Sequence, residues 1–137
     1  MGRIAAIDYG LKRIGIALSD ASKKIAFPLE TVEGGKRALE HIKKALGDKL
    51  ASIEEILVGF PLLLSGKEGE MAALVRKFAE ELEKAFGLPV RLIDERFSSK
   101  LAEQSLTEMQ LNRKKRSRMV DTTSAVMLLQ AYLDRNV

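Results

Sequence analysis

The chain of 137 residues contains no cysteine and a single histidine, His41. The absence of cysteine excludes disulfide bonds, thiolate zinc sites and a cysteine nucleophile, and it suits a reducing compartment. One histidine cannot form a histidine metal cluster, and His41 lies in a Lys- and Glu-rich stretch where we expect a surface position. Metal chemistry in this chain therefore falls to Asp and Glu.

Long apolar runs are also absent. No stretch approaches the roughly 20 apolar residues that a membrane helix needs, and the segment before Asp8 is too short and too soon charged for a signal peptide. We therefore expect a soluble, cytoplasmic protein without a membrane partner. Hydrophobic residues make up 46% and charged residues 31% of the chain, a balance typical of globular proteins. The length predicts one domain over residues 1–137.

The positive charge is local. The net charge is +4, with 23 basic and 19 acidic residues. Five of the basic residues fall within six positions, and without them 18 basic residues face 19 acidic ones. A concentrated patch of this kind is typical of phosphate contact, although a solvated loop or a basic helix end has the same composition. The segment consists of Arg113, Lys114, Lys115, Arg116 and Arg118.

Hydrophobic periodicity predicts an α/β protein. Short apolar or alternating runs predict strands at 3–8, 13–19, 25–32, 55–60 and 90–93, whereas helical spacing predicts helices at 35–49, 68–86, 98–109 and 119–133. The short connections between the first three strands favour an antiparallel meander, and Pro28 favours a sheet edge for the third. The order β-β-β-α-β-α-β-α-α therefore predicts a mixed five-stranded sheet with helices packed on it.

Three carboxylate positions stand at the ends of these elements. Asp8 ends the first strand two residues before Gly10, where a turn-forming Asp is an equally good interpretation. Asp94 and Glu95 follow the last strand, and because adjacent strand residues point to opposite faces, only one of them can face the same site as Asp8. The alternative for this pair is ion pairing with Arg91 or Arg96.

The third position, Asp121, lies in the last predicted helix. It shares a helical stripe with Ala125, Leu128 and Tyr132, which is the stripe expected to face the sheet. A buried carboxylate must be paired, protonated or bound to metal. The alternative is that Asp121 only caps the start of its helix.

Carboxylates without His or Cys ligands favour a hard cation, Mg²⁺ or Mn²⁺. Two such ions can activate a water and stabilise the leaving oxygen of a phosphodiester. The basic segment before Asp121 would then hold a nucleic acid over the metal. This combination is typical of a nuclease.

Five short motifs follow one another along the chain. They are Ile7-Asp8-Tyr9-Gly10 with Arg13-Ile14-Gly15-Ile16-Ala17 and Ser19-Asp20; Val58-Gly59-Phe60-Pro61; Asp94-Glu95-Arg96-Phe97-Ser98 with Ala102; Asp121-x-x-Ser124-Ala125; and Leu129-Gln130-x-Tyr132-Leu133-Asp134. In this order they resemble those of the YqgF-like family of Holliday-junction resolvase-like proteins and pre-16S ribosomal RNA nucleases, over essentially the whole chain. The resemblance implies a ribonuclease H-like fold, a precursor 16S rRNA substrate in preference to a DNA junction, and Asp8, Glu95 and Asp121 as catalytic metal ligands.

One loop departs from the family pattern. The stretch 62–66 is Leu-Leu-Leu-Ser-Gly, where the family usually has Leu-Asn-Met-Asp-Gly, so substrate contacts from that loop are in doubt.

Three other functions fit parts of the pattern. Actin- and Hsp70-like ATPases share the strand order but need two such domains to enclose a nucleotide. A junction resolvase needs the same acids and a homodimer, whereas an rRNA-processing enzyme can act as a monomer or a homodimer. A non-catalytic nucleic-acid-binding factor needs the basic segment but not the acids.

Overall fold

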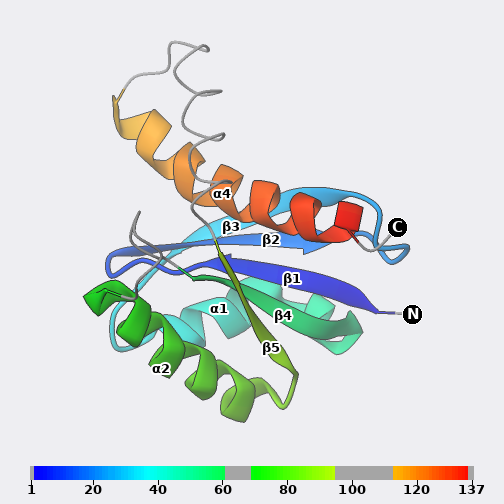
Figure 1. Cartoon of the computed structure of the whole chain (residues 1–137), viewed down its shortest axis with the longest axis horizontal. Helices are drawn as coiled ribbons and strands as arrows, with labels where there is room; N and C mark the ends of the chain where they lie inside the picture. The colour runs from blue at the N-terminus through cyan, green and yellow to red at the C-terminus, as the bar shows by residue number, and fades with distance from the viewer. Residues whose placement is uncertain (1, 61–68, 95–112, 136–137) are drawn as a thin grey trace.

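The computed structural model describes residues 2–60, 69–94 and 113–135, with the side chains of 113–123 excepted. It contains one mixed sheet in the order β3-β2-β1-β4-β5 (Figure 1). β2 is antiparallel to both β1 and β3, whereas β4 is parallel to both β1 and β5. The predicted meander, the mixed sheet and the edge position of Pro28 are therefore confirmed. The strands are β1 (Arg3–Asp8), β2 (Arg13–Ser19), β3 (Ala26–Glu33), β4 (Ile53–Phe60) and β5 (Val90–Asp94).

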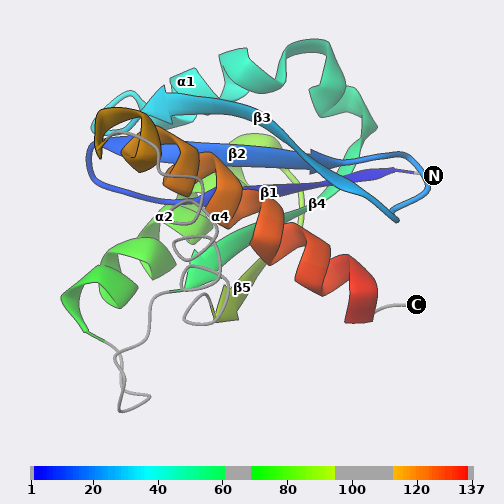
Figure 2. The ribbon, with the colours of Figure 1, turned by 90° about the horizontal axis from the view of Figure 1, so that it is seen from above.

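Helices cover both faces of the sheet. α4 (Arg113–Arg135) lies across one face, and α1 (Ala38–Leu46) and α2 (Glu70–Phe86) lie on the other (Figures 1 and 2). A 3-10 helix, η1 (Gly47–Ser52), leads from α1 into β4. The helix predicted at 98–109 lies outside the described residues. No helix in the described part of the chain is long and apolar enough to cross a membrane.

The two faces of the sheet form two separate cores. Ile4 and Ala6 of β1 pack in the cluster that includes Leu128 and Leu129 of α4. Ala5 and Ile7 pack in the cluster beneath α1 and α2. Because successive strand residues point to opposite faces, membership of these clusters shows the face on which each strand position lies.

The buried side of α2 does not follow its four-residue apolar repeat. Apolar residues recur every four positions from Leu74 to Phe86, yet Leu74 is 42% exposed whereas Val75 is fully buried. A step of four residues turns a helix by about 400°, so a strict four-residue repeat drifts by about 40° each time. Leu74 therefore rotates out of the core that Phe78 and Leu82 occupy.

Two helix boundaries also differ. α1 is shorter than the predicted 35–49, because Gly47, with φ 50°, ends the α-helix and the chain continues as η1. α4 was predicted from Met119, but its described helix already includes Arg113. Lys and Arg are good helix formers, so the basic segment continues the helix instead of preceding it.

Candidate active site

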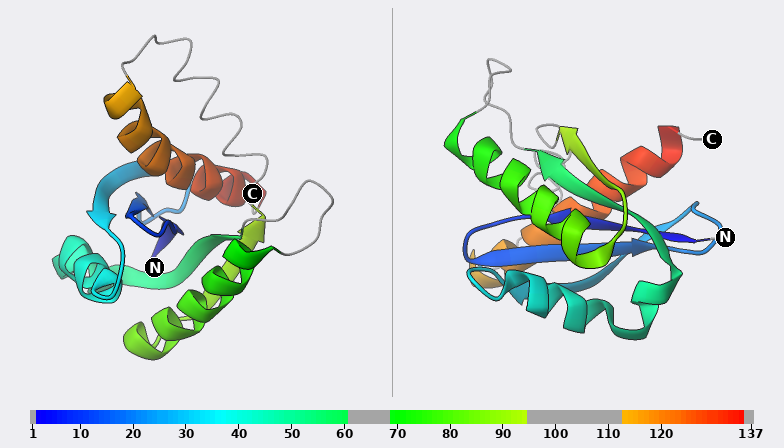
Figure 3. Two further views of the ribbon diagram at one scale, coloured as in Figure 1. Left: turned by 90° about the vertical axis from the view of Figure 1, so that its left-hand side faces the viewer. Right: turned by 90° about the horizontal axis from the view of Figure 1, so that it is seen from below.

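The carboxyl ends of β1, β4 and β5 meet at one edge of the sheet because these strands are parallel. We call this edge the rim; it faces the viewer in the left panel of Figure 3, with α4 on one side and α1 and α2 on the other. Asp8 is the last residue of β1 and Asp94 the last of β5. In open α/β sheets, ligands bind at the carboxyl ends of the strands. The rim is therefore the place where these carboxylates are chemically useful.

Asp8 lies on the α4 face of the rim. Its position in β1 has the same parity as Ile4 and Ala6, which pack against α4. On β2, Asp8 pairs with Gly15. On β4, Val58 pairs with Ile7, so the next residue, Gly59, lies beside Asp8. Both glycines are buried and carry no side chain. The half-buried carboxylate is thus flanked on both strands by residues whose side chains cannot compete with it for a ligand.

Asp94 belongs to the opposite face. Ile93 packs with the α4 cluster, whereas Val90 and Leu92 pack with the α1 and α2 cluster. Strand alternation gives Asp94 the parity of Val90 and Leu92, away from the face of Asp8. Glu95 lies outside the described residues. Arg91, one predicted ion-pair partner for these acids, places Nε 3.5 Å from Oε2 of Glu55.

Asp121 is not a helix cap. It lies well inside α4, so the alternative that it only caps the start of the helix is wrong. It precedes Ala125 by four residues and Leu128 by seven, and both are buried against the sheet. These spacings keep Asp121 on the line of α4 that faces the sheet. Its side chain is not described.

The direction of α4 brings Asp121 toward the rim. Leu133, near the end of α4, lines the same pocket as Ile4 at the start of β1. Asp121 precedes Leu133 by twelve residues, which is about 18 Å of helix. β1 rises about 13 Å from Ile4 to Asp8, so the stretch of α4 from Leu133 back to Asp121 is long enough to reach the rim. Figure 1 shows α4 running from the rim end of the sheet to the end where both chain termini lie.

The basic segment occupies the described start of α4. Arg118 lies three residues before Asp121, and Arg113 lies eight residues before it. The segment therefore extends the same helix by about two turns on the N-terminal side of Asp121. Its side chains are not described. The helical backbone excludes the loop interpretation of the segment and leaves the basic helix end and phosphate contact.

Two tight connections hold the rim in place. The N–H of Gly34, after β3, donates to the carbonyl oxygen of Lys12, after β1, over 2.9 Å. A Cβ on Gly34 would meet the carbonyl oxygen of Leu11 at 2.8 Å, and a Cβ on Gly10 would meet that of Arg13 at 2.5 Å. The backbone is therefore packed too closely for a side chain at Gly10, in the turn that follows Asp8, or at Gly34. Sequence reasoning identified Gly10 but missed Gly34, whose partner is distant in the chain.

Asp20, from the Ser19-Asp20 motif, has a structural position at the other end of the sheet. Its carboxylate accepts hydrogen bonds from the N–H groups of Ile25 and Lys24 and from the hydroxyl of Ser22. These bonds lower the pKa of Asp20 from its ordinary value of 3.8 to about 2. The hydroxyl of Ser19 accepts from the N–H of Ile4 at 2.9 Å and so ties β2 to β1. This motif shapes the β2–β3 hairpin and lies away from the rim.

The metal site is only partly described. Among residues 2–60, 69–94 and 124–135, no three Asp, Glu or His side chains gather closely enough to hold a metal ion. Asp8 is the one predicted ligand whose side chain is described. Its carboxylate oxygens are of the type that Mg²⁺ and Mn²⁺ prefer, and its neighbours Gly15 and Gly59 carry no side chain. The described part of the site therefore fits a hard cation.

The chain matches one family model and is similar in sequence to named proteins over most of its length. A family model described as "RuvX: Holliday junction resolvase" matches residues 2–135. A protein of Protochlamydia amoebophila named "Putative pre-16S rRNA nuclease" is 46% identical over 139 residues, covering 96% of this chain and 93% of its own. A Sulfurihydrogenibium protein of the same name is 41% identical over 137 residues, covering 98% of this chain and 92% of its own.

Solved structures share the fold. T. thermophilus RuvC in complex with a Holliday junction substrate superposes with a TM-score of 0.52 at 18% identity, covering 99% of this chain and 96% of its own. YeaZ from Pseudomonas aeruginosa gives a TM-score of 0.50 at 18% identity, covering 80% of this chain and 50% of its own. These likenesses concern architecture alone and confirm the predicted ribonuclease H-like α/β fold. Together with the family match and the close relatives, they show that the chain belongs to the RuvX family, which the motifs identified as YqgF-like.

Proposed function

We propose that the chain is a metal-dependent nuclease that processes the 5′ end of precursor 16S rRNA. The observation that carries this proposal is the position of Asp8, a carboxylate at the rim, on the α4 face, between two buried glycines. A turn-forming Asp would need neither the two glycine neighbours nor the shared face with α4. The names of the closely related proteins support the choice of substrate.

Asp8, Glu95 and Asp121 would hold the metal. Strand parity removes Asp94 from the face of Asp8, which leaves Glu95 as the acid of this pair that the motif favours. Bound to these carboxylates, Mg²⁺ or Mn²⁺ supplies Lewis-acid activation of water and neutralises negative charge on the leaving oxygen. The residues of the chain fix where the scissile phosphate lies.

Hydrolysis forms one bond from phosphorus to the oxygen of water and breaks the bond to the leaving nucleoside oxygen. Negative charge increases on the phosphoryl oxygens as this happens, so fixed positive charge nearby lowers the barrier. Arg113, Lys114, Lys115, Arg116 and Arg118, on the helix that carries Asp121, would bind the backbone of the substrate. Gly15 and Gly59 would let that backbone approach the sheet closely.

A second candidate is a Holliday-junction resolvase, which the description of the family model favours. Symmetric cleavage of two strands needs two copies of the site related by a two-fold axis. The resolvase therefore requires a homodimer, whereas rRNA processing can proceed with a monomer. Which substrate the protein cleaves, precursor rRNA or a DNA junction, therefore distinguishes the two candidates.

The experiment incubates the purified protein with precursor 16S rRNA, with a four-way DNA junction and with an unrelated single strand. Each substrate is tested with Mg²⁺, with Mn²⁺ and with EDTA, and Asp8→Asn serves as the matched inactive protein. We expect cleavage at the 5′ end of the rRNA that needs the metal and disappears in Asp8→Asn. Selective cleavage of the junction would favour the resolvase. Binding without cleavage under every condition would favour a non-catalytic factor and contradict the proposal.

A further inference from the structure

We propose that the face of the rim opposite Asp8 carries a binding site for one unstacked nucleobase of the substrate strand. The site is a pocket of about 230 Å³ between α1 and α2, which we call the Tyr9 pocket. The inference rests on the proposed nuclease function, because it assigns a second contact to the same strand. Its lining includes Tyr9, Lys36, Leu39, Leu74, Lys77 and Phe78.

Tyr9 connects this pocket to Asp8. It is the next residue in the chain, and it packs with the α1 and α2 cluster, whereas Asp8 has the parity of the α4 face. Its ring lies 4.3 Å, centroid to centroid, from the ring of Phe78 at an interplanar angle of 35°. A strand whose phosphate reaches Asp8 therefore crosses the rim directly beside an aromatic ring that α2 holds in place.

The pocket wall includes one apolar side chain that the core does not cover. Leu39 is half-buried against the α1 and α2 cluster, whereas Leu74 is 42% exposed. A large apolar side chain exposed beside an aromatic ring is suited to the flat face of a base. Stacking of bases on aromatic rings is a general mode of single-strand binding that accepts every base.

The charges at the pocket suit phosphate. Lys36 precedes α1 and Lys77 lies in the first half of α2, so the two lysines come from different walls of the pocket. Glu81, one turn beyond Lys77, also lines the pocket. Phosphate is therefore favoured beside the two lysines and disfavoured beside Glu81.

The size and opening of the pocket fit a single base. Pockets for drug-sized ligands measure about 300–1,000 Å³, so about 230 Å³ is suited to one ring system. Gly35 lines the pocket, and a Cβ placed on it would meet no atom within 4 Å. The pocket is therefore open at Gly35, beside Lys36, where the backbone of a strand would enter.

The test measures equilibrium binding of single-stranded RNA to Asp8→Asn protein, so that no cleavage occurs. One RNA is intact, and each of a series lacks the base at one position near the cleavage site. We expect one abasic position to weaken binding about fivefold or more. In a protein that also carries Leu74→Asp, intact RNA should bind about that much more weakly, and the same abasic position should make no further difference.

Two control pairs separate base contact from charge and from folding. Ala73→Asp adds the same carboxylate at the neighbouring exposed position of α2, and it should leave the abasic effect intact. Lys77→Gln should lower the slope of log affinity against log salt by about 0.7. Lys84→Gln, two turns farther along the same side of α2, should leave the slope unchanged. Melting curves check that each variant is folded.

The outcomes separate the pocket from the nuclease function. If the wild type cleaves RNA but no abasic position couples to Leu74→Asp, the nuclease proposal stands and the Tyr9 pocket is wrong. An unchanged salt slope in Lys77→Gln would likewise contradict the pocket. If the protein neither binds nor cleaves nucleic acid, both proposals fall.

Discussion

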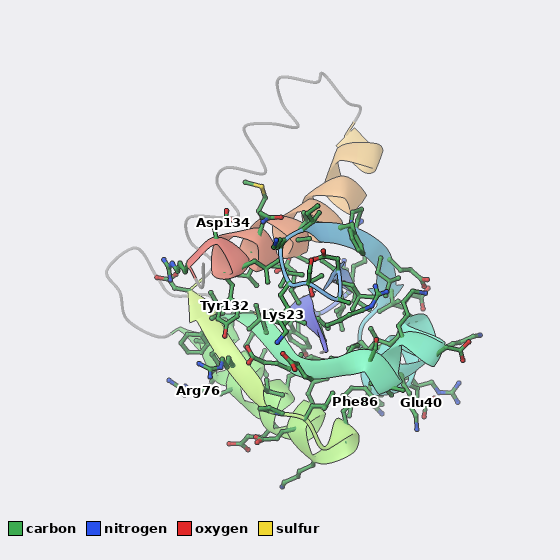
Figure 4. The ribbon with its side chains drawn as sticks, turned by 90° about the vertical axis from the view of Figure 1, so that its right-hand side faces the viewer. Lys23, Glu40, Arg76, Phe86, Tyr132 and Asp134 are labelled. Atoms are coloured by element: carbon green, nitrogen blue, oxygen red, sulfur yellow. The ribbon has the colours of Figure 1, made fainter. Side chains whose placement is uncertain are left out.

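The side chain of Gln130 in α4 accepts a hydrogen bond from the backbone N–H of Ala26 at 2.9 Å, although the two residues lie 104 positions apart. Its amide nitrogen donates to the carbonyl oxygen of Lys24 at 2.9 Å and to Asp134 at 3.0 Å. Lys23 of the β2–β3 hairpin lines one pocket with Tyr132 of α4, and both are labelled in Figure 4. Gln130 thereby fixes α4 against the hairpin and sets how far the helix reaches toward the rim.

We expect Gln130→Ala to lower the free energy of unfolding by about 1–3 kcal/mol, because two backbone groups of the hairpin lose their partner. Nuclease activity should fall further than the folded fraction does, since α4 carries Asp121. Chemical denaturation and activity assays below the melting transition measure the two effects. Asp134→Ala, which removes only the exposed partner of Gln130, is the matched control. Full activity in folded Gln130→Ala would show that the hydrogen bonds of Gln130 do not position the site.

The neighbouring acids Asp94 and Glu95 should behave differently. Loss of a group that only orients a metal ligand typically lowers activity about 10- to 100-fold. Loss of a ligand itself should cost at least as much, so Glu95→Gln should lower kcat by at least about 100-fold. Asp94→Asn should retain activity within about threefold, because strand parity directs it to the other face. Steady-state cleavage assays on the two variants decide the assignment. The reverse ranking would mean that the chain departs from strand alternation at Asp94.

Much of this fold follows from local patterns. The apolar runs of the strands, the short turns and Pro28 predict the meander and its edge, because each signal lies within a few residues. The buried position of Val75 in place of Leu74 could not be predicted from a four-residue repeat, since only packing decides which side of a broad apolar face is covered. The start of α4 was missed because a basic helix carries no apolar period.

The candidate site was predictable as residue types but not as an arrangement. Spacing identified Asp8 and Asp121, yet the pairing of Asp8 with Gly15 depends on sheet register. The parity of Asp94 with the face opposite Asp8 could be assigned only from the two cores, which define the faces of the sheet. The hydrogen bonds of Gln130 join segments more than 100 residues apart, and no local sequence pattern predicts such a contact.

Neutralising the basic segment should weaken binding of all nucleic acid sequences alike. If its five side chains contact phosphates of a single strand, replacing each with Gln should reduce the slope of log affinity against log salt by about 3.5. Binding titrations between 50 and 200 mM salt, about the range where such contacts matter, measure the slope. Lys43→Gln with Lys44→Gln, exposed on α1, is the control that should leave it unchanged. The same slope in both proteins would make the segment a solvated helix end.

Asp20 should contribute a defined part of the acid sensitivity. Its pKa is lowered from 3.8 to about 2 in the folded chain, so its hydrogen bonds stabilise the protein above about pH 4. This stability is lost as the pH falls toward 2, because the unfolded chain binds the proton first. Asp20→Asn should therefore lose less melting temperature than the wild type between pH 5 and about 2. Identical losses in the two proteins would show that these bonds do not favour the carboxylate.

The shared metal site can be tested by melting curves without any substrate. If Asp8, Glu95 and Asp121 form one metal site, Mn²⁺ at millimolar concentration should raise the melting temperature of the wild type, because the ion binds only the folded chain. Mg²⁺ should do so less strongly. Asp8→Asn should remain folded in EDTA and lose most of the response, whereas Asp94→Asn should keep it. A wild type whose melting temperature is the same in EDTA, Mg²⁺ and Mn²⁺ would contradict the account.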